Sequence, residues 1–227
     1  MKILVAIPVY NNVDNVGEVI QKVLRNKLDV LVINDGSTDG TDRILMSFND
    51  IKVFTIQKNK GKGNALRTAF AMAAKENYTH IITIDADGQH NPEEIGKFVE
   101  AVKSSPDSIT IGCRDFSHGK IPYKSTMGRM FSNLGFKIVT GINIADTQSG
   151  FRVYPLKNLC NISFTKDRYD FEMEILLKAA MVGIQIKDIP ISVNYSDKSR
   201  KLSNFSPVAD SFKIANLLLN NLLQRKH

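Results

Sequence analysis

The chain has 227 residues, of which 43% are hydrophobic and 23% charged, and a chain of this length can bury a sizeable core without disulfides or a structural metal. Lys and Arg total 30 against 23 Asp and Glu, and the formal charge of +7 favours anionic partners such as nucleotides, phosphates and anionic lipids. Without a long Lys/Arg run or the aromatic-basic signature of an RNA-binding sheet, nucleic acid is not an expected partner.

Short apolar runs alternate with helical patterns through the first half of the chain. Strands are predicted at residues 3–9, 30–33, 53–56, 81–84 and 109–111. Helices are predicted between them at residues 13–24, 39–48, 65–75 and 92–103. This alternation is typical of βαβ units. The sequence therefore predicts an α/β fold with a mostly parallel central sheet flanked by helices, whose ligands bind beyond the carboxyl ends of the strands.

The second half of the chain is less regular. Helices are predicted at residues 125–139 and 171–180, a strand at 184–193, and polar loops at 146–152 and 196–206. A closing amphipathic helix is predicted at 208–223. No linker or repeat separates these parts. We therefore expect one domain over residues 1–227, with halves at 1–112 and 113–205 and a C-terminal helical segment at 206–227.

Two carboxylates follow the predicted strand at residues 81–84, in the sequence Asp85, Ala86 and Asp87. Crowding two carboxylates at a buried strand end is costly unless a cation neutralises them. Hard oxygen ligands suit Mg²⁺ or Mn²⁺, and Gln89 offers a further neutral oxygen. The alternative is a turn in which both aspartates cap the helix that begins near Pro92.

Glycine-containing polar loops follow the other early strands. Asp35, Gly36 and Ser37 come directly after the strand at residues 30–33, where the glycine permits close backbone approach and the carboxylate can accept hydrogen bonds from a nucleoside. Lys62 and Gly63 stand at a predicted helix N-terminus, which favours anions. Plain structural turns remain the alternative for both loops.

The first predicted strand ends in a rigid turn that contains Pro8, Tyr10 and Asn11. Such a turn can present backbone groups and the Asn11 amide to a nucleoside. On its residues alone, the pattern favours a purely structural turn.

Arg114, Arg129 and Arg152 fall in and around the polar segments of the second half, and Asp146 opens the polar loop. The planar guanidinium binds two phosphate oxygens at once, so a pocket that contains the three arginines would attract a phosphate. The alternative is a set of solvated surface charges.

Taken in order, these motifs resemble those of glycosyltransferase family 2, and within it the branch of the dolichol-phosphate mannosyltransferases and bacterial polyprenyl-phosphate glycosyltransferases. The motifs that carry the resemblance lie at residues 8–12, 35–41, 61–63, 85–89 and 146–152. The resemblance runs from residue 3 to about residue 152 and continues more weakly to about residue 214. It implies a GT-A fold, a UDP- or GDP-sugar donor and a divalent metal, Mg²⁺ or Mn²⁺.

On the donor side, the resemblance implies that Asp35 contacts the base. Residues 85–87 would occupy the family's DxD positions, and the metal site would comprise Asp85, Asp87 and Gln89, the last two as direct ligands. The chain departs from the family at Asn12, where Glu is common, and at Asn34, where Asp is common. The identity of the donor base is therefore left open.

On the acceptor side, the resemblance implies that Arg114 and Arg129 bind phosphate groups and that Arg152 stands in the family's SGFR segment. Glu174 falls near a recurring glutamate of the family. The expected reaction is an inverting transfer to a polyprenyl or dolichyl phosphate, which needs no strong base because it is already anionic. If the acceptor is instead a glycan hydroxyl in cell-envelope polysaccharide synthesis, Asp146 is the expected base.

No apolar stretch approaches the roughly 18 residues of a membrane span, so we expect a cytoplasmic protein that can associate with the inner face of the membrane. The predicted helix at residues 208–223 suits a membrane surface, a homodimer partner or the protein's own core. A nucleotide-sugar-binding subunit without turnover is the non-enzymatic alternative. Nucleotidyl transfer is disfavoured because the glycine-rich signature expected after the first strand is missing.

Overall fold

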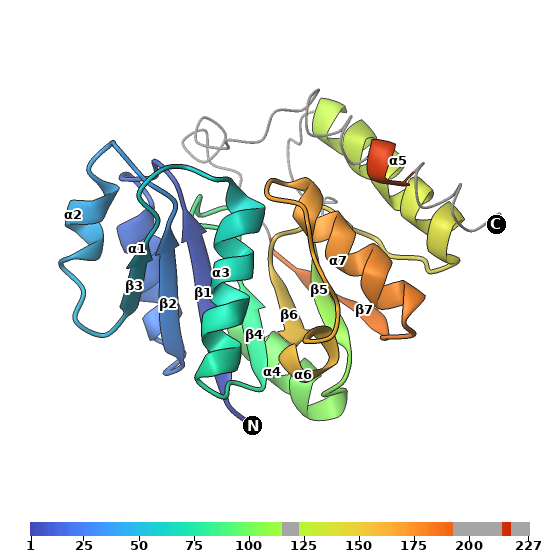
Figure 1. The fold of residues 1–227 in the computed structure, drawn as a ribbon, viewed down its shortest axis with the longest axis horizontal. Helices are drawn as coiled ribbons and strands as arrows, with labels where there is room; N and C mark the ends of the chain where they lie inside the picture. The colour runs from blue at the N-terminus through green and yellow to red at the C-terminus, as the bar shows by residue number, and fades with distance from the viewer. Residues whose placement is uncertain (115–122, 193–214, 219–227) are drawn as a thin grey trace.

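The computed structural model describes residues 1–114, 123–192 and 215–218 (Figure 1). The predicted loop at residues 196–206 and most of the predicted C-terminal helix lie outside the described residues. Residues 215–218 are helical, as predicted. Among the described residues, no helix has both the length and the apolar content that a membrane crossing requires.

Seven strands form one sheet in the order β3-β2-β1-β4-β6-β5-β7. The strands are β1 (Ile3–Val9), β2 (Asp29–Asn34), β3 (Lys52–Thr55), β4 (His80–Thr83), β5 (Ile109–Arg114), β6 (Arg152–Pro155) and β7 (Ile186–Ile191). Only β6 runs antiparallel to its neighbours β4 and β5, and the other pairings are parallel. The prediction of a mostly parallel sheet is confirmed.

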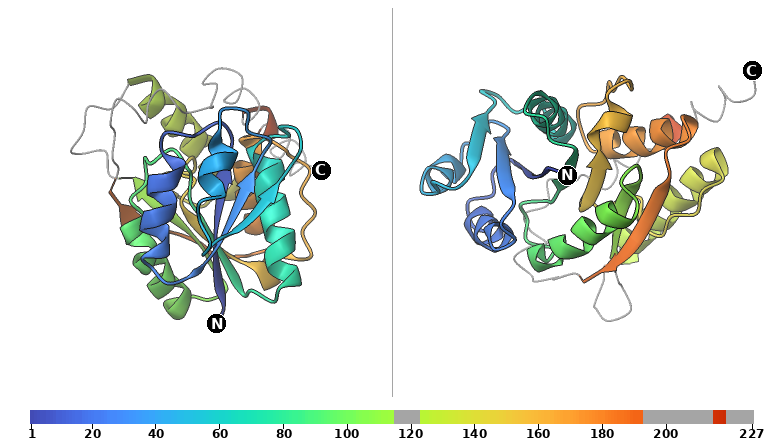
Figure 2. Two further views of the ribbon diagram at one scale, coloured as in Figure 1. Left: turned by 90° about the vertical axis from the view of Figure 1, so that its left-hand side faces the viewer. Right: turned by 90° about the horizontal axis from the view of Figure 1, so that it is seen from below.

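Helices cover both faces of this sheet (Figure 2). They are α1 (Val16–Leu24), α2 (Thr41–Leu45), α3 (Lys62–Lys75), η1 (Pro92–Glu94), α4 (Ile95–Ser104), α5 (Tyr123–Thr140), α6 (Leu156–Leu159) and α7 (Asp170–Met181). The apolar faces of α1, α2 and α4 bury one side of the sheet, and those of α3, α5 and α7 belong to the core on the other side. Because β1, β2 and β4 are covered on both faces, they read in the sequence as continuous apolar runs.

The strand register brings the polar loops to one edge of the sheet. Val9 at the end of β1 pairs with Asn34 at the end of β2, and Asn34 pairs with Thr55 of β3. Asp85 follows β4 two residues after its last strand residue, Thr83, on the same edge. The expected meeting of these loops is therefore confirmed.

The structure corrects several predicted boundaries. The helix predicted from residue 13 begins at Val16, whereas α3 begins at Lys62, three residues before the predicted start, and β5 extends to Arg114. Strand β6 and helix α6 were not predicted. They are only four residues long each, and a pattern of that length carries almost no periodicity.

Candidate active site

A pocket of about 300 Å³ lies at the carboxyl edge of the sheet. Most of its walls come from the loops after β1, β2 and β4 and from the N-terminus of α3, and two residues come from the segment before α7. The lining residues are Pro8, Val9, Tyr10, Asn12, Asp35, Asn59, Gly61, Lys62, Ala65, Asp85, Ala86, Asp87, Arg168 and Tyr169. The pocket thus collects most of the donor-binding residues that the sequence predicted.

The predicted donor-binding residues Asn11, Gly36, Ser37 and Gly63 do not line the pocket. The Asn11 side chain accepts a hydrogen bond from the Thr38 backbone N–H at 2.7 Å, and the Asn11 N–H donates to Ser37 Oγ at 3.0 Å. These bonds join the loop after β1 to the loop after β2. The Asn11 side-chain oxygen therefore already accepts a structural hydrogen bond, with which the predicted nucleoside contact would have to compete.

Asp35 is buried, and its carboxylate shapes the neighbouring loop. Oδ1 accepts a hydrogen bond from the Lys60 N–H at 2.9 Å, and Oδ2 accepts one from the Gly61 N–H at 2.7 Å. Burial raises the pKa of Asp35 above its ordinary value, against the effect of these two bonds. Its contact with a donor base stays a prediction. Beside it, Asn12 Oδ1 is buried without a hydrogen-bond partner among the described residues, which makes it a candidate for the same contact.

Arg168 and Tyr169 line the pocket although no motif predicted them. They reach it because Gly61 and Gly63 let the segment before α7 pack directly on the N-terminus of α3. A Cβ atom at Gly63 would lie 2.6 Å from the Phe171 Cβ, and Gly61 has a positive φ of 100°. This pair of glycines was the one sequence signal of the close approach.

Lys62 links the two halves of the chain inside the pocket. Its Nζ lies 2.6 Å from Asp85 Oδ1 and 2.8 Å from Glu172 Oε2 of α7. Burial alone would lower the pKa of Lys62, but the two carboxylates raise it above its ordinary value, so the ammonium stays charged. Gly150 packs against this ion pair so closely that a Cβ there would clash with Asp85.

Glu172, which no motif predicted, pairs with Lys62 of the pocket, whereas Glu174, noted for its likeness to a family glutamate, does not. The Glu174 carboxylate instead accepts hydrogen bonds from the backbone N–H groups of Thr165 and Lys166. The two side chains stand two positions apart on α7, so a helical pattern alone does not reveal which of them faces the site.

Asp87 carries a carboxylate whose charge is poorly compensated. Burial, and then the neighbouring Asp85, raises the pKa of Asp87 to about 6, although the Gln89 N–H donates to Asp87 Oδ1 at 2.9 Å. The alternative in which the aspartates cap the next helix is wrong, because Asn91 Oδ1 accepts the hydrogen bond from the Glu93 N–H that caps it.

Asp85 and Asp87 fit a divalent cation that also binds phosphate. The described residues hold no group of three or more His, Cys, Asp or Glu side chains that could bind a metal by themselves. Mg²⁺, however, is commonly bound by one or two carboxylates together with substrate phosphates and water. Of the two aspartates, Lys62 pairs with Asp85, which leaves the Asp87 carboxylate for such a cation. Gln89 contributes its backbone N–H to Asp87 and does not line the pocket.

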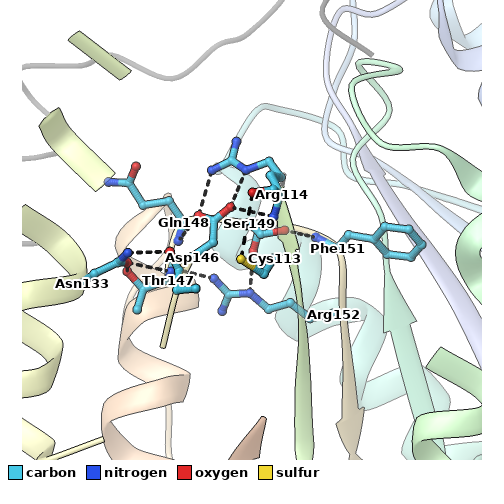
Figure 3. A network of polar contacts seen from close by, with 10 residues as sticks. Cys113, Arg114, Asn133, Asp146, Thr147, Gln148, Ser149, Phe151 and Arg152 are labelled. Atoms are coloured by element: carbon cyan, nitrogen blue, oxygen red, sulfur yellow. Dashed lines mark hydrogen bonds and ion pairs between the residues drawn. The ribbon is translucent and has the colours of Figure 1, made fainter. Parts of the chain in front are cut away.

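Arg114 at the end of β5 forms a bidentate pair with Asp146 (Figure 3). Nε lies 2.6 Å from Oδ2 and Nη2 lies 3.0 Å from Oδ1. Asp146 is fully buried. Burial alone would raise the pKa of Asp146, but Arg114 and then Arg129 hold it below its ordinary value. A carboxylate that is paired in this way is a weak proton acceptor, so the arrangement counts against Asp146 as a general base.

Arg152 occupies a different environment from the one expected of a phosphate ligand. Its side chain is fully buried, and its guanidinium donates to the backbone carbonyl groups of Ser149, Thr147 and Glu172 (Figure 3). The predicted pocket of three arginines is corrected accordingly: Arg152 holds the loop at residues 146–151 against α7, because its buried guanidinium donates to carbonyl groups of both.

A parallel sheet with an acidic pair and clustered cations at its carboxyl edge is the architecture of nucleotide-binding α/β proteins. The model of glycosyl transferase family 2 matches residues 4–160, and the chain belongs to this family.

Two relatives illustrate the similarity. The undecaprenyl-phosphate mannosyltransferase of Micrococcus luteus is 29% identical over 85% of this chain and 83% of that protein. The UDP-N-acetylglucosamine–dolichyl-phosphate N-acetylglucosaminyltransferase of Methanococcus voltae is 27% identical over 96% of this chain and 94% of that protein.

Among solved structures, the glucosyl-3-phosphoglycerate synthase of Mycobacterium tuberculosis, determined with Mn²⁺, uridine diphosphate and phosphoglyceric acid, matches with a TM-score of 0.70 at 16% identity. The match covers 99% of this chain and 78% of that chain. This likeness establishes the fold, which is the GT-A type that the sequence resemblance implied.

Proposed function

We propose that this protein transfers a sugar from a UDP- or GDP-sugar to a polyprenyl or dolichyl phosphate, with inversion at the anomeric carbon. The observation that carries the proposal is the position of Arg114, held by Asp146, next to the acidic pair of the donor pocket. The charge of Arg114 acts on both Asp85 and Asp87. One site can therefore hold two phosphate groups, one from each substrate.

The chemistry asks little of a general base. A phosphate oxygen of the acceptor attacks the anomeric carbon while the bond from that carbon to the diphosphate oxygen breaks, and the nucleoside diphosphate leaves with the electron pair. Because the acceptor is already an anion, no side chain has to remove a proton. The pairing of Asp146 with Arg114 agrees with this requirement.

Positive charge is needed most where the diphosphate departs. Mg²⁺ or Mn²⁺ bound at Asp85 and Asp87 would supply charge that stabilises the leaving diphosphate. Lys62 keeps Asp85 in place. Arg114 and Arg129 orient the acceptor phosphate in line with the bond that breaks.

The relatives' names support this acceptor, since the mannosyltransferase of Micrococcus luteus acts on undecaprenyl phosphate and the enzyme of Methanococcus voltae on dolichyl phosphate. Their sugars differ, so the sugar is left to experiment. A lipid acceptor resides in a bilayer, and we propose that the enzyme works as a peripheral protein at the inner face of the membrane.

A donor screen tests the proposal. UDP- and GDP-sugars are offered at fixed Mg²⁺ or Mn²⁺ with a short-chain polyprenyl phosphate, and the released nucleoside diphosphate is measured. Release that requires both the metal and the lipid phosphate is expected. Release only with glycan acceptors would overturn the lipid-phosphate assignment. Donor binding without any release would instead indicate a non-catalytic nucleotide-sugar-binding subunit.

A further inference from the structure

Helix α5 exposes a row of large apolar side chains to solvent. Met130, Phe131, Leu134 and Ile138 are 62%, 68%, 55% and 59% exposed, respectively. Their spacing of one, three and four residues puts them on one side of a helix. We call these four side chains the α5 apolar face. A contiguous apolar surface of this kind marks an interaction site more often than single exposed hydrophobic residues do.

The opposite side of α5 is fully used by the protein. Phe136 and Val139 are buried in the core that α7 and α3 share, and Leu218 packs on Gly135. Figure 1 shows α5 lying across the outside of α7, at the end of the molecule away from α1 and α2. The α5 apolar face is therefore distinct from the buried side chains that hold the helix against the core.

The polar side of α5 holds the loop that carries Asp146. Ser132 Oγ lies 2.9 Å from Thr147 Oγ1, and Asn133 Oδ1 accepts a hydrogen bond from the Thr147 N–H at 2.9 Å (Figure 3). Gln148 donates to the Gly128 carbonyl group at 3.5 Å. A single helix thus connects the outer surface of the protein to the acceptor side of the site.

Charge indicates what covers the α5 apolar face. From Tyr123 to Ala145 the sequence contains no Asp or Glu, but it contains Lys124, Arg129 and Lys137. Lys137 is exposed next to Ile138. A second copy of the same helix would bring like charges together, whereas an anionic lipid surface complements both the apolar side chains and the cations.

We propose that the α5 apolar face docks on an anionic lipid bilayer. The proposal rests on the lipid-phosphate acceptor proposed above and adds the surface by which the enzyme reaches it. Docking through α5 places the bilayer against the helix that carries Arg129 and holds the loop of Asp146, so that an acceptor can enter the site without leaving the bilayer.

Flotation with vesicles tests the docking surface without any substrate. The full chain is mixed with vesicles of phosphatidylcholine alone or with about one third phosphatidylglycerol. A variant with M130S, F131S, L134S and I138S is expected to bind the anionic vesicles about tenfold more weakly than the unmodified protein, because interfacial binding scales with the apolar area buried.

The matched control removes apolar side chains that are exposed elsewhere. Met46 directly follows α2, and Val53 and Phe54 lie in β3, at the opposite end of the sheet. Their side chains are 79%, 42% and 42% exposed, respectively. The variant M46S, V53S and F54S should float like the unmodified protein. Equal binding by both variants, or no binding by the unmodified protein, would overturn the proposal. So would a dimer of the unmodified protein that the α5 variant converts to a monomer in solution.

Turnover separates this inference from the proposed function. With a short-chain acceptor in solution, the α5 variant should keep its rate, because none of the four side chains belongs to the site. With a long-chain acceptor embedded in anionic vesicles, its rate should fall about tenfold, in parallel with binding. If the rates with the two acceptors fall equally, the α5 apolar face supports the fold of the site and not its docking. If neither protein turns over any acceptor, the proposed function fails while the flotation result still stands.

Discussion

The donor side of the site is held by hydrogen bonds from backbone groups, whereas the acceptor side is held by a pair of side chains. Asp35 accepts two hydrogen bonds from backbone N–H groups of the loop after β3, and Asn11 accepts one from the backbone of the loop after β2. Arg114, by contrast, depends on the carboxylate of Asp146, 32 residues further along the chain.

This difference indicates two kinds of rigidity. Backbone groups in loops anchored to buried strands cannot rotate away, so the donor pocket is preformed. A guanidinium that is oriented by one carboxylate can be released when a competing anion, such as an acceptor phosphate, arrives. Lys62 joins the two sides, since it contacts Asp85 of the donor side and Glu172 of α7.

The largest expected effect is on the donor side. Asp87→Ala should lower turnover about a thousandfold, because it removes a proposed carboxylate ligand of the cation that would stabilise the leaving diphosphate. Steady-state release of nucleoside diphosphate measures the effect. In metal-free buffer the variant should also unfold at a higher temperature than the unmodified protein at pH 8, since a carboxylate whose pKa is raised to about 6 is destabilising when charged.

That gain in stability has a defined pH dependence. The ordinary pKa of Asp87 is 3.8 and its folded value is about 6, so the protein loses stability from this group as the pH rises through that window. The advantage of Asp87→Ala should therefore be full above about pH 6 and absent below about pH 4. Asp107→Ala, which removes an exposed carboxylate at a distant turn, serves as the control. Full metal-dependent turnover by Asp87→Ala would refute the assignment.

The next largest effect is expected at Lys62, which connects the two sides of the site. Lys62→Met leaves the buried carboxylate of Glu172 and the partly exposed one of Asp85 without their shared cation, and should lower the free energy of unfolding by about 3 kcal/mol. Adding Glu172→Gln should recover part of the loss, because one of the two uncompensated charges is then removed. Denaturant titration of the four proteins of this double-mutant cycle measures the coupling. Additive effects would contradict the ion pairs at Lys62.

The position of each residue relative to a strand explains what could be predicted from the sequence. The residues of the donor side follow apolar strands directly, so the strand pattern alone placed Asp35 and Asp85 at one edge of the sheet. The sequence did not reveal Arg168 and Tyr169, because they reach the pocket through the packing of α7 on α3, and only Gly61 and Gly63 hinted at that contact.

The acceptor side was predictable in its residue types but not in their roles. Arg114 and Arg152 have the same chemistry and stand in equally polar segments. Their difference arises because Arg152 is the first residue of β6, an unpredicted strand between β4 and β5, where its side chain is enclosed by the loop and α7. No local pattern encodes such a contact, since it depends on the order of strands in the sheet.

The acceptor side should respond to the loss of a single distant partner. Asp146→Asn removes the charge that orients Arg114, and we expect kcat/KM for the lipid phosphate to fall about thirtyfold, equivalent to about 2 kcal/mol. Donor affinity, measured by calorimetry, should be unchanged because the donor pocket is held by backbone groups. Asp50→Asn, which alters an exposed carboxylate in the turn before β3, is the control. An equal loss of donor affinity would show that the two sides are not independent.

The smallest effect should come from Glu174, which supports the segment that carries Arg168 and Tyr169. The Glu174 carboxylate accepts hydrogen bonds from Thr165, Lys166 and Lys178. Glu174→Gln replaces it with a neutral amide and should lower the free energy of unfolding by about 1.5 kcal/mol at pH 7. Burial alone would raise the pKa of Glu174, but the bonds from Lys178, Lys166 and Thr165 lower it below its ordinary value of 4.5.

The sign of the pH dependence follows from that lowered pKa. The stabilisation by Glu174 is present above about pH 4.5 and is lost as the pH falls through the folded value. Denaturant titrations of the unmodified protein and Glu174→Gln should therefore differ at pH 7 and converge in acid, with the exposed Glu100→Gln as a control that shows no difference at either pH. The segment before α7 carries Arg168 and Tyr169, which line the donor pocket. The variant should therefore also raise the KM for the donor severalfold, while kcat is unchanged. A change in kcat alone would mean that Glu174 acts on the acceptor side instead.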